Sequence, residues 1–157
     1  MPLTTRWRGC DNVRAVDLEG WDRDLTLGVP EMDVEHGLQI ELVNALEGAV
    51  AAGRERELGD RILERLLDYT RVHFLAEELM MRLEGFPAFE AHIEEHDDLT
   101  RQLESIRVVY GAGDRPVTLE AVHALRKWLA GHVRTYDRAF ARFLAARGPA
   151  GHVPAQG

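Results

Sequence analysis

The sequence predicts an all-α protein, an up-down-up-down antiparallel four-helix bundle with an N-terminal arm. Four segments carry apolar residues at alternating steps of three and four, glycine and proline separate these segments, and no strand-like alternation is present. Such a period gives each helix one apolar seam, and four seams that face inward form the core of a bundle. The 157 residues, 45% of them hydrophobic, suffice for one domain with a core.

The expected domain organisation follows from where the helical period begins and ends. Residues 1–20 have no helical period and form the arm, whose role we cannot assign. Residues 21–146 form the bundle, with Trp21 packed on it as a structural residue. Residues 147–157 are rich in glycine and proline and are expected to form a flexible tail.

Helix boundaries are predicted from capping residues and breakers. The first helix is expected to begin near Asp33, a good N-cap residue, and to fade at Ala-Ala-Gly before residue 54. The second helix is expected over residues 57–84, up to a Gly-Phe-Pro break. Pro87 suits the first turn of the third helix, which should reach Tyr110. Thr118 is expected to cap one continuous fourth helix that ends near residue 146.

Composition excludes several classes of function. The net charge of −8 argues against binding to nucleic acid or to anionic membranes. No apolar run is long enough to span a bilayer. The single cysteine, Cys10, cannot form an internal disulfide, so a reducing cytoplasm is the expected location. Because the core uses the apolar seams, we expect a monomer, with no protein partner identified.

Polar residues interrupt the apolar seams at one end of the predicted bundle. Short loops make neighbouring helices antiparallel, so the start of helices one and three and the later half of helices two and four lie at the same end. Five histidines and two carboxylates fall in these places: His36, His73, Glu77, His92, His96, His132 and Asp137. Burying so many polar groups is costly unless they are paired or bind metal.

The chemistry of these side chains favours a metal site with two ions. Residues four apart are offset by about 40° around a helix, so pairs such as His73 and Glu77 can grip one ion. Imidazole and carboxylate together suit iron, zinc, manganese or copper. Seven ligands exceed one tetrahedral zinc site but suit two octahedral ions that share carboxylate bridges. A ferritin-type di-iron site needs two Glu-x-x-His motifs, and only one, Glu120 to His123, is present, with His123 off the seam.

Four short motifs give the chain a resemblance to a known family. They are Met-Asp-Val-Glu-His ending at His36, His-x-x-x-Glu at 73–77, His-x-x-x-His at 92–96 and His-x-x-x-x-Asp at 132–137. In this order they resemble the hemerythrins, specifically single-domain bacteriohemerythrins. The resemblance covers roughly residues 21–144 and also includes His-Phe-Leu-Ala-Glu-Glu-Leu-Met-Met from residue 73.

The resemblance implies a non-haem di-iron centre, two iron ions with an oxo or hydroxo bridge, that binds O2. One iron would take three histidines, the other two, and Glu77 and Asp137 would bridge them. The three are His92, His96 and His132, and the two are His36 and His73. O2 would bind at an open position of the second iron and be held as hydroperoxide, for oxygen carriage, storage or sensing.

Residues near the expected ligands are candidates for the O2 pocket, and ordinary core packing is an alternative role that they can fill at the same time. They are Gln39, Ile40, Phe74, Trp128, Leu129 and Val133. Gln39 departs from the family, which often has leucine at this position. It either rotates to the bundle edge or contacts bound oxygen, where a polar group would stabilise hydroperoxide or admit water.

Two other functions would use the same centre. One is an enzyme that handles peroxide or nitric oxide, so that these molecules would join O2 as partners. The other is iron storage or sensing. We expect reversible O2 binding rather than catalysis, with peroxidase-type activity as a side reaction.

Overall fold

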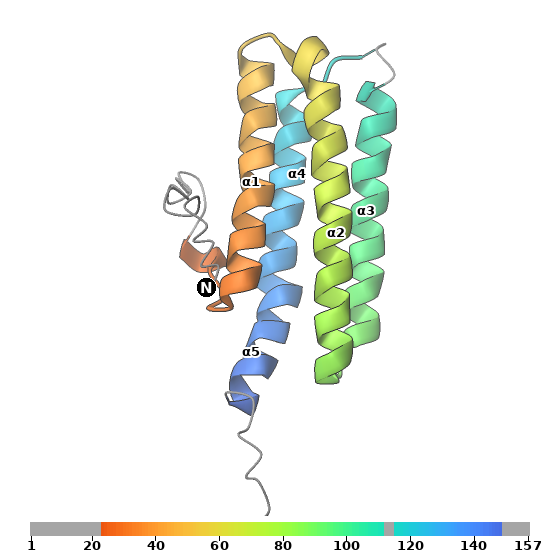
Figure 1. The fold of residues 1–157 in the computed structure, drawn as a ribbon. Coiled ribbons are helices and arrows are strands. Elements are labelled where there is room, and N and C mark those ends of the chain that lie inside the picture. Colours follow the sequence, from red (N-terminus) through yellow and green to blue (C-terminus); the bar gives the residue numbers. More distant parts are fainter. Residues whose placement is uncertain (1–22, 112–114, 149–157) are drawn as a thin grey trace, which may run out of the picture.

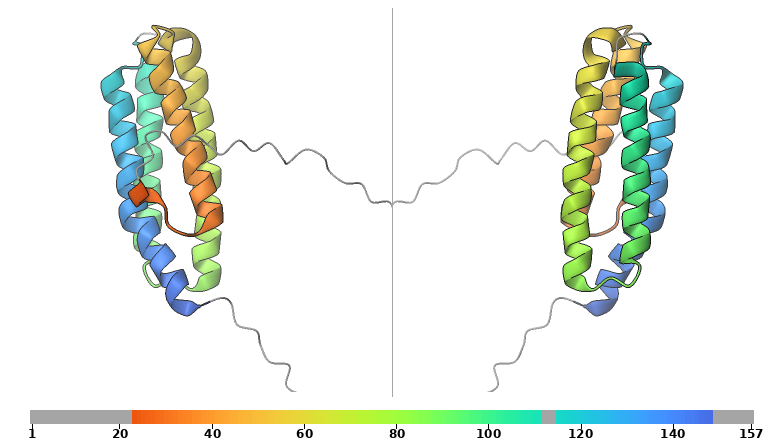
Figure 2. Two further views of the ribbon diagram at one scale, coloured as in Figure 1. Left: turned by 90° about the vertical axis from the view of Figure 1, so that its left-hand side faces the viewer. Right: turned by 90° about the vertical axis from the view of Figure 1, so that its right-hand side faces the viewer.

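The computed structural model describes residues 23–111 and 115–148, and these residues form an antiparallel four-helix bundle (Figure 1). The predicted arm, Cys10, Trp21 and the tail from residue 149 lie outside the described residues. Figure 2 shows α1 beside α4 on one side of the bundle and α2 beside α3 on the other. The helices, in chain order, are η1 (Arg23–Leu25), α1 (Pro30–Ala51), η2 (Glu55–Gly59), α2 (Asp60–Glu84), α3 (Phe89–Gly111), α4 (Leu119–His132), η3 (Val133–Asp137) and α5 (Arg138–Arg147).

The first long helix begins earlier than predicted, because Asp33 is not its N-cap. Helix α1 begins at Pro30, whose fixed φ suits a first helical position and whose missing N–H costs nothing there. The Asp33 carboxylate instead accepts hydrogen bonds from the backbone N–H groups of Leu27, at 2.8 Å, and Gly28, at 3.0 Å. Asp33 therefore fixes the loop that enters the helix.

The turn between α2 and α3 also differs from the prediction. Gly85 ends α2 with a positive φ of 66°, and the N–H of Phe86 bonds back to the carbonyl of Met81 at 2.9 Å. This is the pattern of a glycine helix cap. Pro87 lies in the turn, and α3 begins only at Phe89, so the expectation that Pro87 occupies its first turn was wrong.

The last helical stretch is not one regular helix. Thr118 caps it as predicted, accepting a hydrogen bond from the N–H of Ala121 at 3.3 Å. The five residues of η3, Val133–Asp137, form a π-helical turn between α4 and α5. A π-helical turn carries one extra residue, so the side chains after it are rotated relative to their positions on a regular α-helix.

Two apolar clusters occupy different levels of the core. The larger one contains Val43, Leu46, Leu63, Leu66, Leu67, Leu103, Val117, Ala121, Val122, Leu125 and Leu129. The smaller one contains Met32, Met81, Phe86 and Phe140. The predicted polar residues fall between these clusters along each helix, so apolar side chains close the polar level from above and below. No helix among residues 23–111 and 115–148 is long and apolar enough to cross a membrane.

Candidate metal centre

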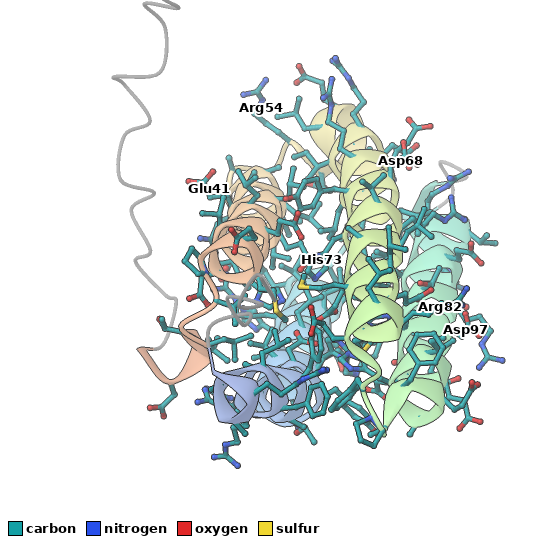
Figure 3. The ribbon with its side chains drawn as sticks, turned by 60° about the horizontal axis from the view of Figure 1, so that its bottom comes forward. Glu41, Arg54, Asp68, His73, Arg82 and Asp97 are labelled. Atoms are coloured by element: carbon teal, nitrogen blue, oxygen red, sulfur yellow. The ribbon has the colours of Figure 1, made fainter. Side chains whose placement is uncertain are left out.

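The structure brings the seven predicted polar residues together inside the bundle. Each of them is at most 3% exposed: His36 from α1, His73 and Glu77 from α2, His92 and His96 from α3, His132 from α4 and Asp137 from η3. Figure 3 shows His73 pointing into the interior, whereas Asp68 and Arg82 of the same helix point outward. Five of the seven offer ligand atoms that all lie within 4.8 Å of one another: Glu77, His92, His96, His132 and Asp137.

Three histidines form one face of this cluster. The Nε2 atom of His132 lies 3.3 Å from Nε2 of His92 and 3.2 Å from Nε2 of His96. Their rings meet at centroid distances of 4.5–5.0 Å. Three imidazole nitrogens aimed at one point are arranged to hold a single ion.

The Asp137 carboxylate lies between this face and the remaining histidines. Its Oδ1 atom is 3.0 Å from Nε2 of His92 and 2.9 Å from Nε2 of His132. Its Oδ2 atom is 3.0 Å from Nε2 of His36, whose ring lies 4.9 Å from that of His73. The two oxygens of one carboxylate therefore point at two separate groups of histidines, as a bridging ligand requires.

Glu77 reaches the same cluster from α2. Its Oε2 atom is 3.3 Å from Nε2 of His96 and 3.8 Å from Nε2 of His92. Burial, reinforced by the negative charge of Asp137, raises the pKa of Glu77 well above its usual range. Burial alone would raise the pKa of Asp137 too, but the charge of His132 and hydrogen bonds from His132, His36 and His92 hold the pKa well below its usual range.

The π-helical turn explains how Asp137 reaches the centre. Residues five apart on a regular α-helix, such as His132 and Asp137, lie about 140° apart around the axis. A π-helical turn has i→i+5 hydrogen bonds and takes more residues per turn than an α-helix, so both side chains point inward. The sequence spacing alone could have signalled this, because two ligands at five-residue spacing on one face demand an irregular turn.

Two carboxylates outside the seven orient histidines, and neither was among the predicted site residues. Glu35 of α1 places Oε2 at 2.6 Å from Nδ1 of His73. Glu78, which directly follows Glu77, places Oε1 at 3.0 Å from Nδ1 of His96. An N–H at Nδ1 that donates to a carboxylate leaves Nε2 deprotonated and free to bind metal. The signal was available, since each glutamate directly adjoins a predicted ligand.

Burial lowers the pKa of both oriented histidines despite these carboxylates. Burial and the charge of His36 lower the pKa of His73 to about 4, although Glu35 opposes the shift. Burial likewise lowers the pKa of His96, and Glu78 opposes it. Both imidazoles are thus neutral at neutral pH, which is the form that binds metal.

The unsatisfied polar atoms of the cluster fit metal ions. Within the described part of the chain, Nε2 of His73 and the Glu77 carboxylate oxygens are buried without a hydrogen-bond partner. Leaving such atoms unpaired is costly in a protein interior, and binding to a cation removes the cost. The donor set of imidazoles and carboxylates suits iron and related transition metals.

The predicted pocket residues occupy different surroundings. Gln39 is 3% exposed and its Nε2 atom donates to Oγ1 of Thr70 at 3.1 Å, so it points into the bundle. Phe74 stacks on the ring of His96 with centroids 3.8 Å apart and ring planes at 5°. Ile40, Leu129 and Val133 are buried.

Trp128 has different surroundings from the other pocket candidates. It is half-buried and lines an open pocket of about 640 Å³ together with residues of α3, and the described residues of that lining include none of the seven polar residues. One aromatic contact was not predicted: Tyr136 stacks on His132 with ring centroids 5.6 Å apart. His123 is exposed and lies 3.2 Å from Glu47, so the expectation that it stays off the seam is confirmed.

Comparison with known proteins agrees with this geometry. Residues 27–144 match the family model described as hemerythrin HHE cation binding domain. The chain belongs to the hemerythrin family. The bacteriohemerythrin of Methylococcus capsulatus is 32% identical over 114 residues, which is 73% of this chain and 86% of that protein. The bacteriohemerythrin of Ralstonia nicotianae is 31% identical, over 82% of this chain and 90% of that protein.

Solved hemerythrin structures share the fold. A crystal structure of wild-type hemerythrin superposes with a TM-score of 0.70 and 29% sequence identity, covering 76% of this chain and 91% of that one. The resemblance inferred from the motifs is therefore confirmed at the level of family and fold.

Proposed function

We propose that this hemerythrin-family protein binds O2 reversibly at a non-haem di-iron centre. His92, His96 and His132 would hold one iron, and His36 and His73 the other, with Glu77 and Asp137 between them. The single observation that carries the proposal is the Asp137 carboxylate, whose two oxygens lie 2.9–3.0 Å from imidazole nitrogens of both groups. When bound there, two ferrous ions would each supply one electron to O2.

The chain's own residues support binding rather than rapid turnover. Apolar clusters lie on both sides of the polar level along the bundle, and Phe74 covers one face of His96. Such a dry setting slows the entry of water that would displace bound oxygen. His73 and His96 keep their metal-binding nitrogens deprotonated through Glu35 and Glu78. These residues therefore suit a site that holds O2 and releases it. We also propose that the protein is located in the cytoplasm.

The deciding experiment starts from protein whose metal content has been measured and which has been reduced without air. Two irons per chain and an absorption band that appears with O2 and disappears under vacuum would support the proposal. Fewer than two irons, or no reversible band, would contradict it.

A di-iron enzyme for peroxide or nitric oxide is the second candidate, and the buried Gln39–Thr70 pair favours it. The pair lies one helical turn from His36 and His73, where the rest of the neighbouring core is apolar. A polar pair there can admit water and can form hydrogen bonds with a bound ligand. Both effects would speed oxidation of the centre. Rapid conversion to the diferric form with turnover of added peroxide or nitric oxide would favour this function.

A further inference from the structure

Two of the clustered histidines lack a carboxylate partner of the kind that orients His73 and His96. The Nδ1 atoms of His73 and His96 each contact a glutamate carboxylate, at 2.6 and 3.0 Å. The Nδ1 atoms of His92 and His132 are also buried, but they have no hydrogen-bond partner among the described residues. The orientation of these two rings therefore depends on other contacts.

The ring of Tyr136 contacts both of these histidines. Its centroid lies 5.6 Å from that of His132, with ring planes at 14°, and 5.6 Å from that of His92, with ring planes at 50°. Phe74 contacts His132 at 5.5 Å, and Phe86 contacts His92 at 6.4 Å, so each phenylalanine reaches one member of the pair. Apart from the histidines themselves, Tyr136 is the aromatic ring among residues 23–111 and 115–148 that spans the pair.

The π-helical turn Val133–Asp137 carries this tyrosine. Two consecutive side chains of the turn, Tyr136 and Asp137, both lie against His132. The Oδ1 atom of Asp137 is 2.9 Å from Nε2 of His132, whereas the Tyr136 ring stacks on the imidazole. One residue thus acts at the metal-facing nitrogen, and the other covers a face of the ring.

Aromatic packing can replace a hydrogen bond in holding an imidazole. Without a partner at Nδ1, a neutral imidazole can turn about its Cβ–Cγ bond and present Nδ1 instead of Nε2 to an ion. A flat ring packed against it hinders that rotation. Tyr136 is half-buried, whereas His92 and His132 are at most 3% exposed, so the tyrosine also separates them from solvent. Unlike a carboxylate, it adds no negative charge beside Glu77 and Asp137.

We propose that Tyr136 is a positioning residue for one of the two metal positions. Its ring holds His92 and His132 with Nε2 toward the ion, which is the role that Glu35 and Glu78 fill for the other two histidines. The inference rests on the di-iron centre of the proposed function and adds a residue outside the seven ligands to one half of it.

The two metal positions depend on Tyr136 unequally. His92 and His132 both belong to the three-histidine position, whose third member, His96, keeps its contact with Glu78. The two-histidine position contains neither of them. Loss of the tyrosine ring should therefore weaken the binding of one ion and leave the other bound. A general destabilisation of the bundle would instead weaken the binding of both.

The first test titrates the metal-free, full-length protein with Co²⁺ and follows absorption and heat. In Tyr136→Leu one ion should bind at least about tenfold more weakly than in the wild type, and the other within about threefold. Tyr136→Phe keeps the ring and should bind both ions like the wild type. Tyr110→Leu is the matched control, because Tyr110 is a half-buried tyrosine of α3 that packs on the larger apolar cluster. Circular dichroism melting checks folding, and Tyr136→Met, which fills more of the space, carries the same prediction if Tyr136→Leu does not fold.

The second test measures how fast the imidazole N–H protons exchange with water in the Zn²⁺-loaded protein, by nuclear magnetic resonance. In Tyr136→Leu the Nδ1 protons of His92 and His132 should exchange at least about tenfold faster, because the ring that covers them is gone. Those of His73 and His96 should keep their rates, because their carboxylate contacts remain. Tyr136→Phe and the control should match the wild type at all four histidines.

The outcomes separate this inference from the proposed function. A wild type that binds fewer than two Co²⁺ ions contradicts the di-iron centre and the role of Tyr136 with it. A wild type that binds two, with Tyr136→Leu indistinguishable from it, overturns the role of Tyr136 alone. Faster exchange at all four histidines, or a Tyr136→Phe variant as impaired as Tyr136→Leu, also overturns the assignment of the ring to this pair.

Discussion

Glu35 on α1 and His73 on α2 are joined by a 2.6 Å contact between Oε2 and Nδ1, so a half-exposed acid of one helix fixes a buried imidazole of the next. If this contact selects the tautomer that binds metal, Glu35→Gln should weaken metal binding at the site by about 10–100-fold. Metal titration of the metal-free protein measures it. The control is Glu31→Gln, an exposed acid one turn earlier on α1. Equal affinities in the two variants would contradict the role of Glu35.

Glu77 opposes stability in the metal-free protein and supports metal binding. Its pKa in the folded state is raised above the unfolded value of 4.5. Protonated Glu77 therefore stabilises the fold fully below about pH 4.5, and this stabilisation is lost as the pH rises through the folded pKa and the buried carboxyl becomes charged. We expect metal-free Glu77→Gln to melt a few degrees higher than the wild type at alkaline pH, and the two to converge in acid.

Glu77→Gln should also weaken metal binding at the centre. A neutral amide is a weaker metal ligand than a carboxylate, so Glu77→Gln is expected to bind fewer than two ions per chain. Melting curves across pH, with and without metal, test both halves. A variant that gains no stability at alkaline pH would show that Glu77 is paired or solvated without metal.

Gln39→Leu should lengthen the life of the oxygenated form. Leucine removes the amide that donates to Thr70 and leaves an apolar side chain of similar length. A buried hydrogen bond contributes about 1 kcal/mol. A change of that size in the activation free energy of autoxidation alters its rate several-fold. Decay of the oxygenated absorption band measures that rate. Gln102→Leu, on the surface side of α3, is the control and should decay like the wild type.

Phe74→Ala tests the stacked wall of the centre. Phe74 is 4% exposed and lies flat on His96, so its removal leaves a cavity and frees the imidazole. The free energy of unfolding should fall by about 3–5 kcal/mol, which lowers the melting temperature by roughly 10–15 °C. Phe74→Leu should recover more than half of the loss. A melting temperature within about 3 °C of the wild type for Phe74→Ala would contradict this packing.

Most of the bundle could be predicted from sequence because its signals are local and periodic. The seams of α1 to α4 and the breaks at Gly85 and before Thr118 follow from spacing and from glycine and proline chemistry. Helix starts were less accurate, because Asp33 accepts hydrogen bonds from the preceding loop and so a good cap residue did not mark the first turn. The N-capping preference of Asp33 is overridden there by its hydrogen bonds to the loop.

The polar cluster was also predictable, since antiparallel helices align the seam histidines at one end. The carboxylates that orient His73 and His96 were not among the predicted site residues, because Glu35 and Glu78 lie off the seams and reach the histidines only across helix boundaries. Whether Gln39 faced inward could not be decided from its spacing alone. Its partner Thr70 belongs to another helix, and the pairing becomes visible only when α1 and α2 are docked.

The π-helical turn Val133–Asp137 has a consequence for anyone who transplants this centre into a designed scaffold. An ideal bundle has regular helices, and copying the seven side chains onto it at their native spacing would turn Asp137 about 100–140° away from His132. A working graft must therefore carry the extra residue on its last helix, or move the aspartate one position closer to the histidine. The geometry of this centre therefore depends on an irregular backbone turn as well as on the seven side chains.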